Sequence, residues 1–427
     1  MSMTDVAIVG AGPYGLSLAA HLRRHGLDFR IFGQPMEFWL KIAQGAGNRY
    51  LKSFGFGTNI YTPENGYSFA EYCLKRGLES FEPCAISDFA NYGIWVQQNV
   101  IPNVERFDVI NVSHIRGGYH LMLSSGEELF AKRVVIATGL TSFAILPPEL
   151  THLPEHFVSH TSEIGKFNSL GGRDVCIVGA GQSALEAAML LHDAGARPHL
   201  LVRGSRVAWN RRVSQGRTWW HRLRSPISGL GTGPKAWVLT KFPSAVHYAP
   251  EKWRVRFVAR HLPAEGAWWL RDNVEKNVPI DLNCTLAGAS ERNGRVLVLI
   301  HDRTNGERQL ACDHVVAGTG FRLDIDHLSF LSADLRASVH RIEGAPKLDR
   351  HFESSVRGLF FVGPTSALSF GPLFRFVVGA SYVAPFLSAH LASKKVDWSS
   401  IPQGHPNQDC HKALPKARQL RSAEPRV

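Results

Sequence analysis

Apolar residues gather in short runs along the chain, and two of these runs lead directly into glycine-rich turns. The first run, residues 4–9, precedes the turn GAGPYG and a helical pattern that ends near His25. The second run, residues 175–178, precedes GAGQSA and a helical pattern that ends near Ala194. A strand, a glycine turn and a helix in this order form the phosphate-binding end of a Rossmann-like unit. The chain therefore carries an internal duplication that predicts two dinucleotide sites.

The duplication continues downstream of both turns. Each helix is followed by a second short strand, at residues 29–32 and 199–202, and later by a group of short β segments. Turn signals separate these segments, at Gly117-Gly118, Ser125-Gly126, Asn293-Gly294 and Asn305-Gly306. Asn-Gly between apolar runs predicts a β-hairpin. The two groups close on VVIATG, residues 134–139, and VVAGTG, residues 315–320, and each predicts a strand that ends at a ligand-binding sheet edge.

We predict an α/β fold with two Rossmann-like dinucleotide-binding domains, the second inserted into the first. The outer domain comprises residues 1–160 and 321–395, and the inserted domain comprises residues 161–320. Within the inserted domain, residues 207–280 form an insertion that holds seven of the ten tryptophans of the chain. Residues 396–427 are polar and basic, and we expect them to form a poorly ordered tail.

The composition of the 427 residues, 44% hydrophobic and 20% charged, is that of a globular protein with a sizeable core. The six cysteines are scattered without a C-x-x-C pair, so we expect no bound metal and a cytoplasmic location with reduced thiols. No window is apolar enough for a transmembrane helix, and Asp5 stands where a secretory signal needs basic residues. These features predict a soluble protein.

The net charge of +12 is concentrated in one segment, residues 203–224, which contains seven arginines and no acidic residue. Such a segment suits a local phosphate group, a nucleic acid or an anionic membrane surface. Because the glycine turns already explain a basic rim, we favour a nucleotide phosphate and expect no nucleic-acid partner. The neighbouring tryptophans suit an apolar substrate chamber, a membrane-facing patch or an aromatic core, of which we favour the core.

Coenzyme specificity is decided at the end of the second strand, where an acidic residue would bind a ribose 2′-hydroxyl. The second unit has Arg203, Ser205 and Arg206 at this position. Guanidinium groups suit a 2′-phosphate, so the pattern favours NADPH over NADH, unless these arginines are simply solvated. The other predicted contacts of this unit are Gly179, Gly181, Gln182, Ser183 and Gly320.

The first unit lacks the ribose-binding acid, because Gly33 stands at the end of its second strand. Glu37 lies a few residues further on and is our candidate for this contact. An N-terminal unit beside an inserted NADPH unit indicates that the first nucleotide is FAD. The other residues predicted to bind FAD are Gly10, Gly12, Pro13, Gly15, Trp39, Gly139 and Gly363.

The motifs GAGPYG, VVIATG, GAGQSA and VVAGTG, with the closing GLFFVG at residues 358–363, resemble those of the class B flavin-dependent monooxygenases. The resemblance spans residues 4–392 and implies FAD and NADPH as cofactors. The segment FVSHTSEI is similar to the linker motif of that family, with His160 in place, but Ser159 replaces its glycine and Ile164 its aromatic residue. This departure disfavours Baeyer–Villiger chemistry and favours oxygenation of nitrogen or sulfur.

The same resemblance implies four candidate catalytic residues. Asn59, in LKSFGFGTNIYTP, resembles the asparagine that flavin-containing monooxygenases place near the flavin C4a position, and Lys52 lies in the same segment. Asparagine is also a common turn residue. His160 is either a catalytic residue or a linker histidine hydrogen-bonded to backbone. Arg375 follows the closing strand and contacts flavin or substrate, unless it pairs with an acid.

We therefore expect an NADPH-consuming, FAD-dependent monooxygenase. As the resemblance implies, it inserts one oxygen atom of O2 into a small nitrogen or sulfur nucleophile through a C4a-hydroperoxyflavin. Three alternatives stay open: an NADPH-dependent flavin reductase or oxidase, a Baeyer–Villiger monooxygenase, and a flavin-binding sensor without enzymatic activity. The lack of a C-x-x-C pair disfavours a disulfide reductase. Self-association as a homo-oligomer is compatible with the sequence.

Overall fold

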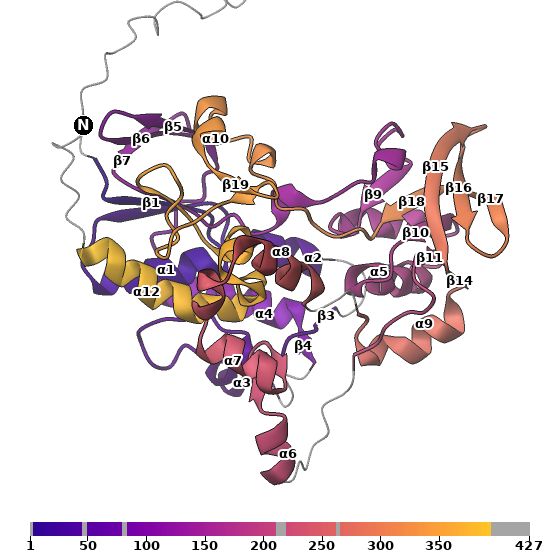
Figure 1. Cartoon of the computed structure of the whole chain (residues 1–427), viewed down its shortest axis with the longest axis horizontal. Helices are drawn as coiled ribbons and strands as arrows, with labels where there is room; N and C mark the ends of the chain where they lie inside the picture. Colours follow the sequence, from indigo (N-terminus) through magenta and orange to yellow (C-terminus); the bar gives the residue numbers. More distant parts are fainter. Residues whose placement is uncertain (1–2, 45–48, 79–82, 211–218, 262–264, 394–427) are drawn as a thin grey trace, which may run out of the picture. The chain divides into compact units, whose positions relative to one another are not determined.

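The computed structural model describes residues 3–44, 49–78, 83–210, 219–261 and 265–393. The predicted tail, residues 396–427, lies outside the described residues, as do residues 394–395. Two parallel sheets organise the described chain (Figure 1), and each is built around one of the two glycine turns. The α/β class and the duplicated Rossmann-like architecture are confirmed.

The first sheet has the strand order β2-β1-β8-β21, and all of its pairs are parallel. Its strands are β1 (Val6–Val9), β2 (Phe29–Phe32), β8 (Val134–Ile136) and β21 (Leu359–Phe361). Apart from Arg30 in β2, all of their residues are apolar, as expected for strands covered on both faces. Because β21 follows the second unit in the chain, that unit is inserted into the first. Helix α1 (Pro13–Arg24) follows β1, and α12 (Ala380–Ser393) packs beside α1.

The second sheet has the order β14-β11-β10-β18-β9, again with parallel pairs only. Its strands are β9 (Val158–His160), β10 (Asp174–Val178), β11 (Arg197–Leu201), β14 (Ile280–Asp281) and β18 (His314–Ala317). Helix α5 (Gln182–Asp193) follows β10 as α1 follows β1. The buried residues Ile177, Leu185 and Leu200 belong to the hydrophobic core between this sheet and α5.

Each unit also contains a three-stranded antiparallel sheet. The first is β5 (Val109–Ile115), β6 (Gly118–Leu123) and β7 (Glu128–Ala131), and the second is β15 (Cys284–Arg292), β16 (Arg295–Asp302) and β17 (Gly306–Cys312). In the turn between β15 and β16, Asn293 has a φ of 52° and Gly294 a φ of 75°. Positive φ at both central residues is the type I′ turn that Asn-Gly favours, so this predicted hairpin is confirmed.

Close packing behind the two glycine turns explains why their third motif residues differ. In the first turn, a Cβ at Gly15 would lie 1.9 Å from the carbonyl oxygen of Gly10, so only glycine fits. The second turn has Ala184 at the matching position, and this residue faces Gly318 in VVAGTG. A Cβ at Gly318 would lie 2.5 Å from the Ala184 Cβ. The glycine missing from GAGQSA is therefore compensated by a glycine on the neighbouring strand end.

The segment between β2 and β5 and the segment before β21 complete the first unit. Their elements are α2 (Glu37–Ala43), β3 (Tyr50–Leu51), α3 (Phe69–Arg76), β4 (Cys84–Ala85), α4 (Ile86–Val100), α10 (Ala333–Ser338), β19 (Arg341–Ile342), β20 (Ala345–Pro346) and, after β21, α11 (Ala367–Phe370).

The insertion contains α6 (Trp219–Arg224), β12 (Ile227–Ser228), β13 (Gly231–Thr232), α7 (Pro234–Lys241), α8 (Glu251–Arg260) and α9 (Arg271–Asn277). Its residues Leu230, Leu239 and Val246 are buried in the hydrophobic core of the first unit, although the sequence places them within the second. None of its seven tryptophans is buried, and Trp219 and Trp220 are 59% and 61% exposed. The prediction of an aromatic core is therefore wrong, because aliphatic side chains fill the contact with the first unit and four of the tryptophans are exposed. Trp209 is half-buried and packs against the hydrophobic core of the second unit.

A buried ion pair joins the two units. Arg49 precedes β3 of the first unit and donates through Nη2 to Glu186 of α5, and both side chains are only 7% exposed. Its Nη1 donates to the carbonyl oxygen of Ile42. Because burial removes water from both charges, loss of one partner leaves the other without compensation.

We expect Glu186→Ala to lower the free energy of unfolding by about 3–5 kcal/mol, because it leaves the Arg49 charge buried and unpaired. Glu251→Ala is the matched control, since it removes the exposed ion pair with Lys347 and should cost at most about 1 kcal/mol. Denaturant unfolding of both variants measures the difference. Equal losses would show that the buried pair contributes no more than a surface pair.

Candidate functional site

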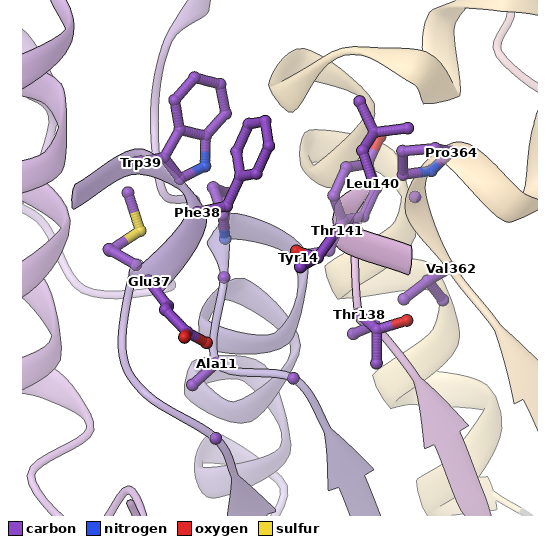
Figure 2. A pocket seen from close by; sticks show the side chains of 18 of the residues that line it. Ala11, Tyr14, Glu37, Phe38, Trp39, Thr138, Leu140, Thr141, Val362 and Pro364 are labelled. Atoms are coloured by element: carbon purple, nitrogen blue, oxygen red, sulfur yellow. The ribbon is translucent and has the colours of Figure 1, made fainter. Parts of the chain in front are cut away.

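A cavity of about 650 Å³ lies at the carboxyl ends of β1, β8 and β21. The motifs GAGPYG, VVIATG and GLFFVG line it, because parallel strands bring their carboxyl ends to one edge of the sheet. Figure 2 shows side chains from these separate segments around one space. The predicted FAD contacts that line this cavity are Gly10, Gly12, Pro13, Glu37, Trp39, Gly139 and Gly363.

The first glycine turn leaves room for a phosphate group. A Cβ at Gly12 would meet nothing within 4 Å, whereas a Cβ at Gly10 would lie 2.5 Å from the carbonyl oxygen of Ala137. Gly12 is the N-cap of α1, and no side chain caps the first turn of this helix. Unpaired N–H groups at the positive end of a helix form a common phosphate site. The turn therefore fits the pyrophosphate of a dinucleotide.

One buried polar atom in this cavity supports the same interpretation. The hydroxyl oxygen of Thr138 has no hydrogen-bond partner within the described chain. A buried hydroxyl without a hydrogen-bond partner costs free energy, so we expect a ligand or a water molecule to be its partner. Thr138 stands in VVIATG, next to the predicted contact Gly139.

Glu37 and Trp39 reach the cavity from α2. Figure 2 shows the Glu37 carboxylate pointing toward the turn at Ala11, with Phe38 and Trp39 beside it. Glu37 also pairs with Lys41, with 2.5 Å between Oε1 and Nζ. Trp39 makes an edge-to-face contact with Phe38. The side chains of Glu37 and Trp39 thus line the cavity at its α2 side, and their contacts with a nucleotide stay predictions.

A second cavity, of about 760 Å³, lies at the carboxyl ends of β10, β11 and β18. The predicted NADPH contacts that line it are Gly179, Gly181, Gln182, Ser183, Arg203 and Gly320. Gln182 Oε1 accepts a hydrogen bond of 2.7 Å from the backbone N–H of Ala267, while its Nε2 is buried without a partner among the described residues. The second cavity therefore repeats the first, with a glycine turn, a helix N-terminus and one unpaired polar group.

Three predicted cofactor contacts line neither of these two cavities in the described chain. Gly15 packs behind the first turn and supports it. Ser205 and Arg206 are exposed beyond Arg203, because the cavity wall passes from Gly204 to β15. Arg203 is thus the only residue of the predicted arginine-serine-arginine group that lines the second cavity among the residues the structure describes.

Asn59 and Lys52 lie outside the first cavity, although the residues next to them line it. Asn59 Oδ1 accepts a hydrogen bond of 2.8 Å from the backbone N–H of Phe69, at the N-terminus of α3. Lys52 Nζ donates to the carbonyl oxygen of Glu265 at 3.0 Å. Both side chains hold neighbouring segments together, and their catalytic roles stay predictions.

His160 ends β9 and is buried. Its Nε2 donates to the carbonyl oxygen of Gly320 at 3.0 Å, and its Nδ1 accepts from the backbone N–H of Ser162 at 3.1 Å. Burial lowers the pKa of His160, so the ring is neutral at neutral pH. These hydrogen bonds to backbone are those expected of a histidine that holds the linker in place. A catalytic role for His160 stays a prediction.

Arg375 is the predicted catalytic residue that does line the first cavity. No ion-pair partner of Arg375 occurs within the described ranges, so the alternative in which it pairs with an acid is not observed there. The surrounding protein lowers the pKa of its guanidinium by desolvation. The hydroxyl of Tyr14 lies 2.7 Å from the carbonyl oxygen of Phe376 and so anchors this segment to α1. Arg375 is therefore a cation at the cavity wall that has no ion-pair partner among the residues described.

Several residues that line the first cavity were not predicted from the sequence, and three of them are informative. Thr138 and Tyr14 lie inside the quoted motifs but were not singled out, and Gly229 comes from the distant insertion. A Cβ at Gly57 would lie 2.7 Å from the Cα of Gly229, so these two loops approach each other closely. Glycines in FGFG and in SGLG were a signal for such an approach, because glycine permits backbone contact.

No described group of three or more His, Cys, Asp or Glu side chains could hold a metal ion. Every helix within the described chain is too short or too polar to span a bilayer. The five described cysteines are free thiols, and Cys410 lies outside the described residues.

Residues 4–218 match the family described as pyridine nucleotide-disulphide oxidoreductase, which is half of the chain. The chain belongs to this family. The family combines flavin and NAD(P) binding in one fold, which agrees with the two dinucleotide cavities. The chain is therefore an oxidoreductase of a flavin-dependent family.

Curated relatives align over a limited length. Ferredoxin--NADP reductase 1 of Listeria welshimeri is 24% identical over 201 residues, which are 47% of this chain and 54% of that protein. The probable indole-3-pyruvate monooxygenase YUCCA3 of Arabidopsis thaliana is 29% identical over 217 residues, 46% of either chain. The chain thus spans about half the length of the curated relatives it matches.

A solved structure shares the fold over nearly the whole chain. The ornithine N-hydroxylase of Kutzneria sp. 744, determined with reduced FAD, NADP+ and L-ornithine, superposes with a TM-score of 0.74 at 18% identity. The superposition covers 91% of this chain and 99% of that chain. The predicted resemblance to class B flavin-dependent monooxygenases is confirmed at the level of the fold.

Proposed function

We propose that this chain is an FAD-dependent, NADPH-consuming monooxygenase that transfers one oxygen atom of O2 to a nitrogen or sulfur atom of a small molecule. One observation carries the proposal: each unit holds a cavity with a glycine turn, a helix N-terminus and an unpaired polar group. Its fold is that of a solved ornithine N-hydroxylase, which supports the same chemistry.

FAD is assigned to the first cavity. The open backbone at Gly12 and the N-terminus of α1 would bind the pyrophosphate. The Thr138 hydroxyl would form a hydrogen bond with the same FAD molecule. The carboxylate of Glu37 would accept hydrogen bonds from ribose hydroxyls. When bound, FAD would accept a hydride from NADPH and supply the reaction with O2, which side chains cannot perform.

NADPH is assigned to the second cavity. Gly181 and the N-terminus of α5 would bind its pyrophosphate, and the guanidinium of Arg203 would bind the 2′-phosphate. In the first cavity, Arg375 is placed to bind an anionic group of the flavin or of the substrate. The side chains of Trp39 and Leu140 would exclude water from the reacting atoms.

A flavin reductase or oxidase is the second candidate function, because a ferredoxin--NADP reductase is among the relatives. Such an enzyme would consume NADPH without inserting oxygen into a substrate. Among the residues that the structure describes, no cysteine lines the first cavity, which disfavours a dithiol reaction at the flavin. A cytoplasmic location is proposed with either function, and the free thiols of the described cysteines support it.

Turnover under ¹⁸O₂ distinguishes these functions. We expect the holoprotein to lose its flavin absorbance when NADPH is added without oxygen, and to form an ¹⁸O-labelled product from at least one compound in a panel of amines and thioethers. Mass spectrometry of the products and a peroxide assay make the measurement. Recovery of all NADPH electrons as hydrogen peroxide across the panel would overturn the monooxygenase proposal in favour of an oxidase. Electron transfer to dyes without O2 consumption would indicate a reductase.

A further inference from the structure

One outer face of the insertion carries an unusual concentration of exposed apolar side chains. We call it the α6–α8 face and define it by Trp219, Trp220, Ile227, Trp237, Val238, Phe242, Tyr248 and Trp253, which are 59%, 61%, 42%, 38%, 45%, 58%, 73% and 49% exposed. Isolated exposed apolar residues are ordinary, but neighbouring ones mark an interaction site, and Val238, Phe242 and Trp253 line one groove. None of these residues lines either dinucleotide cavity.

The helices of this face expose apolar residues on the side turned away from the protein. In α7, Ala236 and Leu239 are the buried side, while Trp237 and Val238 are exposed. In α8, Val258 is buried and Trp253 is exposed, and the Trp253 ring stacks on Phe257 with 4.6 Å between the centroids. Residues three to four positions apart share one side of a helix, as the buried Ala236 and Leu239 of α7 and the stacked Trp253 and Phe257 of α8 do.

The two helices enclose a groove of about 430 Å³ that is almost wholly apolar. The groove is lined by Pro234, Lys235, Val238, Leu239, Phe242, Ala245, Val246, Ala249, Trp253 and Phe257. Its one charged side chain is Lys235, whose ammonium lies 4.7 Å from the centre of the Phe257 ring. This ammonium makes a cation–π contact with the ring and gives the groove a positive charge.

The sequence that carries α6 and α7 has charge of one sign. Residues 194–250 contain no aspartate or glutamate. Exposed basic residues lie on the same three helices as the apolar ones, and they are Arg224, Lys235, Lys241, Lys252, Arg256 and Arg260. The next acid along the sequence is Glu251, which pairs with Lys347 at 2.9 Å.

We propose that the α6–α8 face binds an anionic membrane surface, with α7 and α8 lying in the plane of the lipid headgroups. Tryptophan and tyrosine favour the interface between water and hydrocarbon, because their rings are apolar and carry one polar group. Lysine and arginine beside them attract anionic headgroups, and interfacial helices combine both features. The occupant is therefore a bilayer surface rich in anionic phospholipid.

Two other occupants fit this face less well. A second copy of the chain would bring the same basic residues against each other in a symmetric contact, and that juxtaposition is repulsive. A single-stranded nucleic acid binds stacking rings that alternate with phosphate contacts along a track. Here Val238, Leu239 and Val246 line a groove without polar contacts, which suits acyl chains better than bases.

Co-sedimentation of the full-length holoprotein with lipid vesicles tests the proposal. We expect binding to vesicles of phosphatidylcholine mixed with phosphatidylglycerol, little binding to phosphatidylcholine alone, and weaker binding as salt screens the charges. The pair Phe242→Ser and Trp253→Ser should weaken binding by about tenfold or more. The matched control is Leu74→Ser, because Leu74 is 77% exposed on α3, outside this face.

Charge reversal gives an independent arm of the experiment. Lys241→Glu with Lys252→Glu should abolish binding to anionic vesicles, whereas Arg292→Glu with Arg303→Glu, an equal change of charge on exposed residues of the second unit, should leave most of it. Retained flavin absorbance and an unchanged thermal transition show that each variant is folded. The proposal would be overturned if both charge-reversed variants lost vesicle binding equally. It would also be overturned if Leu74→Ser weakened vesicle binding as much as the Phe242 and Trp253 substitutions do.

Two more outcomes also count against it. Loss of self-association in the Phe242 and Trp253 variant, with no vesicle binding by the parent protein, would assign the face to a second copy. Tight binding of a single-stranded oligonucleotide that the same substitutions abolish, again without vesicle binding, would assign it to nucleic acid. None of these results depends on oxygen transfer, so failure here and failure of the proposed function are distinguishable.

Discussion

Gly12→Val is expected to give a folded chain that no longer retains FAD. The backbone at Gly12 is extended, with φ −84° and ψ −172°, a conformation that valine adopts readily. A Cβ there meets no protein atom within 4 Å, so the new side chain points into the cavity where the pyrophosphate would lie. We expect FAD affinity to fall at least about 100-fold, or ~2.8 kcal/mol. Flavin absorbance after desalting and titration of the apoprotein with FAD measure the loss.

Three other glycine variants make this result specific. Gly165→Val is the control, because a Cβ at Gly165 also meets nothing within 4 Å but lies outside both cavities, and FAD should stay bound. Gly15→Val should instead prevent folding, since its Cβ would lie 1.9 Å from a backbone oxygen. Gly181→Val should keep FAD and lose NADPH. A yellow Gly12→Val protein beside a colourless Gly181→Val protein would show that the two nucleotides are assigned in the wrong order.

The parallel sheets and the nucleotide cavities could be predicted from sequence because local patterns determine them. A buried parallel strand must be an apolar run, and the turn that follows must be glycine where backbone approaches backbone. Gly10 and Gly179 meet this condition in the same way, since a Cβ at either would lie about 2.5 Å from a carbonyl oxygen of the neighbouring strand end. The two signals stand in contiguous sequence and need no knowledge of the rest of the fold.

The side chains around the reacting groups could not be predicted in this way. Asn59 and Thr58 are adjacent, but Thr58 lines the first cavity and Asn59 bonds to Phe69 instead. The path of an irregular loop decides which of two neighbours faces a cavity, and periodicity gives no information there. Gly229 reaches the first cavity from a segment more than a hundred residues beyond the turn. Such a contact depends on how the insertion packs, which its composition alone does not indicate.

The tryptophans of the insertion show a related limit. Tryptophan is usually well buried, so an aromatic core was the reasonable expectation from residue counts. The buried sides of α7 and α8 are instead formed by Ala236, Leu239 and Val258, and Trp237 and Trp253 lie on the outer sides. Helical phase distinguishes the two sides, so the pattern of positions within each helix was the signal to use, rather than the count.

A preference for NADPH over NADH is expected to depend on Arg203. Its guanidinium lines the second cavity beyond the end of β11, and no described residue forms an ion pair with it. A 2′-phosphate would supply the missing anion, whereas a bare ribose would leave the arginine solvated and unused. A charge-assisted hydrogen bond contributes about 1.5–3 kcal/mol, which is roughly 10- to 150-fold in affinity. Arg203→Ala should weaken the binding of NADPH by this factor and leave the binding of NADH nearly unchanged.

Arg206→Ala is the matched control for this prediction, because Arg206 is exposed three residues further on and does not line the cavity. It should alter NADPH affinity by less than about threefold, since a charge outside the cavity is screened by water and salt. Flavin reduction under anaerobic conditions, followed for the parent and both variants at several concentrations of each coenzyme, gives the apparent affinities. If Arg206→Ala weakened NADPH binding as much as Arg203→Ala does, the preference for NADPH over NADH would come from the overall positive charge of this segment. If Arg203→Ala weakened both coenzymes equally, the arginine would bind the pyrophosphate or the adenine that they share.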